Sequence, residues 1–156
     1  MTPYPHRVVI VPRRVDAALL LLALLRRGVQ PEVWSDAGGG SYVPSLPIAI
    51  HEAVHALDLG LPEPWRRTTI GTALDSLRLR ERVTREVLAT AAGEIVTREI
   101  GDATDPLLWE RVHSSLVQDR SAIPRETFRA RVDATVRRPS TRALADRVLD
   151  LGGRCG

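Results

Sequence analysis

Residues 47–60 read PIAIHEAVHALDLG, an apolar stretch that carries helix signals at both ends. Pro47 is favoured in the first turn of a helix. Gly60 is a typical residue just beyond a helix, and Pro62 follows it. Apolar residues recur at helical spacing between these ends: Ile50, Ala53, Val54 and Leu57. The sequence therefore predicts a helix from about Pro47 to Leu59 with one buried face.

This stretch contains the motif HExxH, formed by His51, Glu52 and His55. Side chains four residues apart on a helix lie on the same face. Both imidazoles can therefore reach one metal ion at about 2.0–2.1 Å. Glu52 can then act as general base toward a water that the metal activates. The motif predicts bound Zn²⁺ and a zinc-dependent hydrolase, whereas the simpler alternative is a helix with two half-buried, hydrogen-bonded histidines.

A catalytic zinc site needs a third protein ligand. The extended motif HExxHxxGxxH does not continue here, because Asp58 lies three residues after His55 and Gly60 is out of register. A glutamate on a helix is the third ligand in many HExxH enzymes, which makes Glu94 one candidate. His113 is more simply an ordinary helix histidine.

Three stretches together resemble the peptidase domain of the FtsH-type zinc metallopeptidases. That family carries HEAGHA, and residues 51–56 read HEAVHA. Residues 91–95, AAGEI, are similar to the family's Ala-rich helix. Residues 104–107, TDPL, match a short stretch of the form NDL in which the family's Asp binds zinc. The resemblance implies that Asp105 is the third zinc ligand, with Asp102 as the neighbour that would replace it.

The resemblance covers roughly residues 45–119 and departs from the family at several points. Val54 replaces the family's Gly, and the hairpin after the motif helix is short. ATPase and membrane segments are absent from the sequence. The resemblance thus implies a zinc metallopeptidase that acts on a peptide or protein substrate and is not ATP-dependent by itself. The alternatives are a non-catalytic metal-binding or protein-interaction module, or a regulatory protease dedicated to one partner protein.

The charged residues exclude some functions. All 22 basic residues are Arg, so the chain has no Lys for a Walker A phosphate loop. The net charge is only +3, and the arginines are spread along the chain among acidic residues, so no nucleic-acid partner is expected. Aromatic residues are 4% of the chain, which predicts a core built from aliphatic side chains.

Two features bear on the compartment. Cys155 is the single cysteine, so no intramolecular disulfide can form, and a reducing cytoplasmic setting fits. The most apolar run, residues 17–25, is about half the ~20 residues that cross a bilayer, so it predicts a buried helix and no membrane span. The sequence does not indicate an oligomeric state.

The hydrophobic patterns predict a single, mostly helical α+β domain over residues 1–156. Residues 1–40 form a small β-α-β-like element in this prediction, with strands at 7–11 and 32–34 and a helix at 16–27. Residues 45–156 form a helical metallopeptidase-like core, in which a zincin-like HExxH helix packs with a long Ala-rich helix. The further predicted elements are a possible edge strand at 68–70 and helices at 76–100, 106–119, 124–137 and 141–151.

Overall fold

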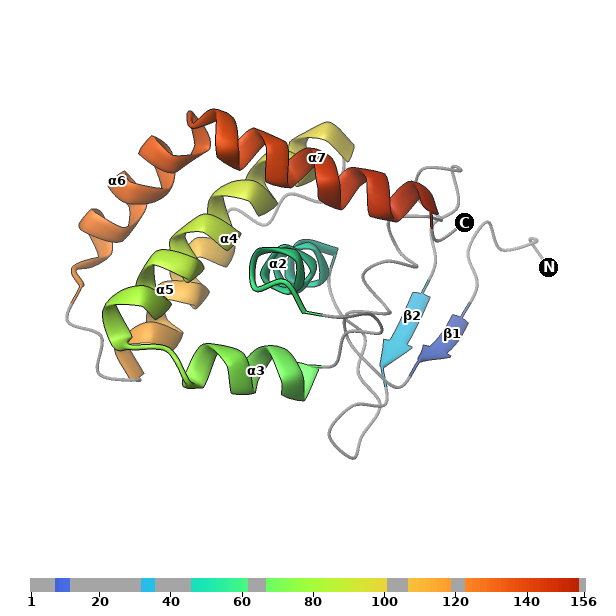
Figure 1. The fold of residues 1–156 in the computed structure, drawn as a ribbon, viewed down its shortest axis with the longest axis horizontal. Coiled ribbons are helices and arrows are strands. Elements are labelled where there is room, and N and C mark those ends of the chain that lie inside the picture. Colours follow the sequence, from blue (N-terminus) through green and yellow to red (C-terminus); the bar gives the residue numbers. More distant parts are fainter. Residues whose placement is uncertain are drawn as a thin grey trace.

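The computed structural model describes residues 8–11, 32–35, 46–61, 67–100, 107–118 and 123–154. This part of the chain is mostly helical, as predicted (Figure 1). Its helices are α2 (Leu46–Asp58), α3 (Arg67–Asp75), α4 (Leu79–Ile100), α5 (Leu108–Gln118), α6 (Arg125–Val136) and α7 (Pro139–Arg154).

Helix α4 is the longest of the described helices and the centre of their packing. It contacts α2, α5, α6 and α7. Helix α2 contacts α3, α4 and α7, and Figure 1 shows it nearly end-on between α7 and α3. The helix that carries the HExxH motif is therefore enclosed by other helices and does not lie on an open surface.

The core consists of two clusters of buried aliphatic side chains that meet on α4. The first joins α2, α3, α4 and α7, and the second joins α4, α5 and α6. Phe128 is the aromatic residue at the centre of the second cluster and is fully buried. Since α4 serves both clusters, it has apolar residues on more than one side. The expectation of an aliphatic, helix-built core is confirmed for the described residues.

Helix α2 ends in a Schellman motif at Gly60. The backbone N–H of Leu61 donates to the carbonyl of Ala56 at 3.0 Å, and the N–H of Gly60 donates to Leu57 at 3.1 Å. Gly60 has φ of 65°, a conformation that glycine adopts without steric cost. The predicted end of the motif helix is therefore confirmed.

The helices predicted after residue 75 are confirmed to within a few residues, but the edge strand at 68–70 is wrong. These residues belong to α3. Ile70 and Leu74 lie one helical turn apart and are both buried in the first cluster, which α2 shares. Burial of this face outweighs the preference of β-branched residues for strands.

The N-terminal part is described only at two short strands. β1 (Val8–Val11) pairs in parallel with β2 (Glu32–Ser35), with Val8 opposite Glu32. The helix predicted at 16–27, including the apolar run, lies outside the described residues, so the β-α-β-like element is not shown. Among the described helices, none combines the length and hydropathy needed to span a membrane.

Candidate metal centre

Helices α2 and α4 bring the two motif histidines together with a glutamate that the sequence analysis did not single out. His51 and His55 lie on the α4-facing side of α2, and Glu86 of α4 lies against them, 35 positions after His51. Small buried side chains let the two helices approach. At Gly93, an added Cβ would lie only 3.9 Å from Cγ2 of Ile50. The close packing of these helices therefore positions the site.

The polar atoms of the three side chains converge on one point. The Nε2 atoms of His51 and His55 are 3.1 Å apart. Glu86 places Oε2 at 3.2 Å from Nε2 of His51 and Oε1 at 2.7 Å from Nε2 of His55. The two rings are nearly perpendicular, at 85°, and their centroids are 4.7 Å apart. His51 and His55 are 6% and 1% exposed, so the point of convergence is well shielded from solvent.

This group could hold a metal ion. A tetrahedral Zn²⁺ with ligands at about 2.0–2.1 Å keeps neighbouring ligand atoms about 3.3 Å apart. The two Nε2 atoms, 3.1 Å apart, are close to this value, and one oxygen of Glu86 lies 3.2 Å from His51 while the other lies 2.7 Å from His55, so an outward movement of the carboxylate would accommodate the ion. Two imidazoles and one carboxylate are also a donor set of catalytic zinc sites, in which the fourth position is left to water. The residues therefore fit zinc in both chemistry and spacing.

Hydrogen bonding alone explains the arrangement less well. If both Nε2 atoms carried protons, the two N–H groups would be crowded together at 3.1 Å. If one did not, its lone pair would face the Glu86 carboxylate. A cation between the three groups would use all of these lone pairs. The Nδ1 atoms of His51 and His55 have no hydrogen-bond partner among the described residues. Within this part of the chain, both rings therefore make their polar contacts through Nε2.

Without a metal, the contacts within the group favour a protonated His55 beside an ionised Glu86. Burial would raise the pKa of Glu86, but the charge of His55 and the hydrogen bonds with both histidines outweigh it and hold this pKa far below its usual range. Burial would lower the pKa of His55, but the negative charges of Glu86, Glu52 and Asp58 outweigh it and raise this pKa. Because its raised pKa favours the protonated form of His55, a metal competes with a proton for this ring.

A cavity of about 330 Å³ opens beside the three residues. His51, Glu52 and Glu86 line it, together with Arg82 and Arg111. Glu52 is half-buried and directed to this cavity, whereas the polar contacts of Glu86 are with the histidines. The position predicted for a general base thus borders a space that a small part of a substrate can enter.

The predicted alternatives for the third ligand have different outcomes. Asp105 and Asp102 lie outside the described residues, so Asp105 stays a prediction. Glu94 is not part of the group that could hold a metal, and Arg129 donates to both of its carboxylate oxygens at 2.7 and 3.0 Å. His113 donates a hydrogen bond to the carbonyl of Ile123 at 2.9 Å, in line with an ordinary helix histidine.

Helical periodicity could have identified Glu86 from the sequence. Glu86 and Gly93 are seven residues apart and lie on nearly the same face of α4. Ala89 and Thr90 share this face and are buried. A face of small residues indicates close approach of another helix, and a glutamate on it is expected to meet that helix. Glu94 lies about one quarter of a turn away from this face.

No family model matches the chain, and no match was found to a curated protein or to a solved structure. The resemblance to FtsH-type peptidases therefore remains an expectation from short motifs. The functional assignment has to rest on the geometry of the site.

Proposed function

We propose that this protein is a zinc-dependent hydrolase and that His51, His55 and Glu86 hold the metal. The observation that carries the proposal is the convergence of two imidazole nitrogens and a carboxylate within about hydrogen-bond distance of one another. The donor set favours Zn²⁺, because hard cations such as Mg²⁺ and Ca²⁺ prefer oxygen ligands throughout.

Glu52 is the group in this chain that would move the proton. A bound Zn²⁺ supplies a Lewis acid and makes water acidic enough to react near neutral pH. Glu52 borders the same cavity as the ligands His51 and Glu86. Its carboxylate would take the proton from the attacking water and return it to the leaving group. Peptide bonds are the proposed substrate, as the HEAxHA motif suggests.

The second candidate is a non-catalytic metal-binding module that acts by protein interaction. The His55–Glu86 contact of 2.7 Å is compatible with it, because such a contact can join α2 and α4 without any reaction. Such a module has no need for Glu52 at the cavity, so the hydrolase is the better-supported proposal. A peptidase dedicated to one partner protein falls under the same mechanism.

The test compares wild type with Glu52→Gln in metal content and in hydrolysis of an unfolded protein and a peptide library. Both proteins should contain about one zinc per chain. Turnover should fall about 10²–10⁴-fold in Glu52→Gln, because an amide cannot accept the proton. Equal cleavage by both proteins, or a folded wild type that does not retain zinc, would refute the hydrolase. Zinc binding with cleavage by neither protein would favour the binding module.

A further inference from the structure

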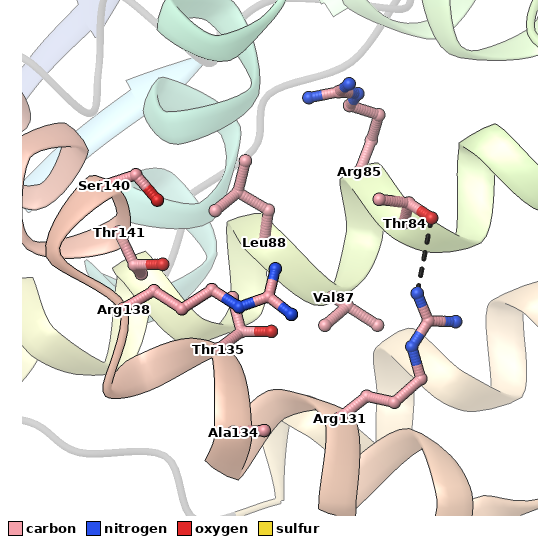
Figure 2. Close-up of a pocket in the computed structure, with 10 residues that line it drawn as sticks. All are labelled: Thr84, Arg85, Val87, Leu88, Arg131, Ala134, Thr135, Arg138, Ser140 and Thr141. Carbon is pink, nitrogen blue, oxygen red and sulfur yellow. Dashed lines mark hydrogen bonds between the residues drawn. The ribbon is translucent and has the colours of Figure 1, made fainter.

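A second cavity, of about 250 Å³, lies between α4, α6 and the beginning of α7 (Figure 2). Ten residues line it, and none of them is Asp or Glu. Three are arginines, namely Arg85, Arg131 and Arg138. The cavity is separate from the candidate metal centre, since the two share no lining residue. Its lining carries positive charge with no acidic group to balance it within the cavity.

The arginines differ in their partners. Arg85 is paired with Asp58 at 3.0 Å and with Glu81 at 2.6 Å. Arg131 donates to the hydroxyl of Thr84 at 3.3 Å, which is a neutral acceptor. Arg138 is exposed, and Figure 2 shows it reaching from the turn between α6 and α7 toward α4. Arg131 and Arg138 are therefore the two guanidinium groups best placed to receive an anion.

The first turn of α7 supplies a second, independent indication. Thr141 is fully buried, and its Oγ1 has no hydrogen-bond partner among the described residues. A buried hydroxyl is normally satisfied, so this one calls for a partner that enters the cavity. In Figure 2 the hydroxyls of Thr141 and Ser140 both point toward the space that Arg138 enters. The N-terminus of a long helix such as α7 also favours negative charge.

We propose that this cavity binds a phosphate group, carried by a compact phosphomonoester. A phosphate has enough acceptor oxygens for two guanidinium groups and for the Ser140 and Thr141 hydroxyls at once. The rest of the lining includes Val87, Leu88 and Ala134, which offer apolar surface to the organic part of the ligand. The volume limits that part to a small group. The proposal is independent of the zinc-dependent reaction.

The test is calorimetric titration at fixed ionic strength with phenyl phosphate, inorganic phosphate and benzoate. Phenyl phosphate should bind saturably, one per chain, and more tightly than inorganic phosphate, which lacks the apolar part. Benzoate should bind more weakly than both. Binding of benzoate equal to that of phenyl phosphate would overturn the phosphate assignment. Absence of saturable binding by either phosphate would overturn the site itself.

Variants locate the binding. Arg138→Gln should weaken the binding of phenyl phosphate about tenfold or more, as loss of a charge-assisted hydrogen bond does. Thr141→Val removes only the hydroxyl and should weaken binding roughly fivefold. Without ligand, Thr141→Val should melt at a higher temperature than wild type, because the buried hydroxyl, which is unpaired among the described residues, is gone. The same measurement checks that the variant folds. The matched control is Arg147→Gln, an exposed arginine of α7 outside the cavity, which should bind as wild type does.

His51→Ala separates this site from the candidate metal centre. It should bind phenyl phosphate with unchanged affinity, because His51 does not line this cavity. Loss of binding in a His51→Ala protein that still unfolds cooperatively would show that the phosphate goes to the metal instead and would overturn the proposal. An equal loss in Arg147→Gln and Arg138→Gln would overturn it as well, since binding would then depend only on overall charge.

Discussion

On the side of α4 that faces α2, Glu86 meets two imidazoles, whereas on the side that faces α6 the neighbouring Val87 borders a cavity lined by arginines and hydroxyls. The two residues are adjacent in sequence, and one helical step of about 100° directs them to different sides. A single helix thus separates a site suited to a cation from one suited to an anion.

The two sides differ in how their charges are compensated. The Glu86 side chain is 14% exposed and has both histidines as partners, so its charge is balanced inside the protein. Arg138 remains exposed to water, which can solvate its charge until a ligand arrives. Substitutions at the metal side should therefore alter both binding and stability, whereas substitutions at the arginine side should alter binding with little loss of stability.

The largest effect is expected from removal of the third ligand. Glu86→Gln should weaken zinc binding at least about a hundredfold, beyond the 10–100-fold that is typical for loss of a supporting residue. Glu94→Gln is the matched control on the same helix, because Glu94 is paired with Arg129 and should not affect zinc. Competition with a zinc chelator measures the affinities.

Asp105→Asn tests the prediction from the family resemblance in the same assay. Asp105 directly precedes Pro106 and an apolar run, so the sequence also suits a helix N-cap at this position. Asn caps a helix about as well as Asp, so a capping role alone would leave zinc affinity unchanged in this variant. If Asp105→Asn loses zinc and Glu86→Gln retains it, the ligand set proposed here is wrong.

The second effect is an opposite pH dependence of stability and zinc affinity. The raised pKa of His55 stabilises the metal-free protein fully below about pH 6.5, and this contribution is lost as pH rises through the raised pKa. The lowered pKa of Glu86 stabilises the protein above about pH 4.5, and this contribution is lost as pH falls. The contribution of this pair to the free energy of unfolding should therefore decrease as pH rises from 6.5 to 8.

Zinc affinity should increase over the same interval, because fewer protons need to be displaced from His55. Denaturant unfolding of chelator-treated protein and zinc titrations at several pH values measure the two trends. In Glu86→Gln the stability trend should be reduced, since the partner charge is absent. Parallel trends in stability and affinity would show that His55 is not protonated in the metal-free site.

The smallest effect is expected from a methyl group added between α2 and α4. Gly93 is buried in α4, and a Cβ there would be in ordinary contact with Ile50 at 3.9 Å. Gly93→Ala should raise the free energy of unfolding by about 0.5–1 kcal/mol through helix propensity, with zinc affinity unchanged. Gly71→Ala in α3, which meets no atom within 4 Å, is the control for propensity alone. A loss of zinc affinity in Gly93→Ala only would show that the helix spacing limits the metal site.

The sequence predicted the local elements well and the assembled site only in part. Periodicity and end signals located α2 and the later helices, and the motif placed His51 and His55 on one face. The small residues on the Glu86 face of α4 predict that another helix packs there, but they do not identify that helix as α2, which lies 35 positions earlier in the chain. The predicted edge strand at 68–70 is wrong for a related reason, since the helical state of this segment depends on burial against α2. The prediction of Asp105 awaits the zinc measurements.

The 35 positions that separate His51 from Glu86 contain the whole of α3. An ion bound by both ends would close this segment into a loop, as a covalent crosslink does, and would remove conformations that the opened chain could otherwise explore. Backbone amides of α3 should then exchange with deuterium more slowly when zinc is present, although α3 supplies no ligand of this group. The metal would in this way decrease how often α3 opens locally, although it does not contact that helix.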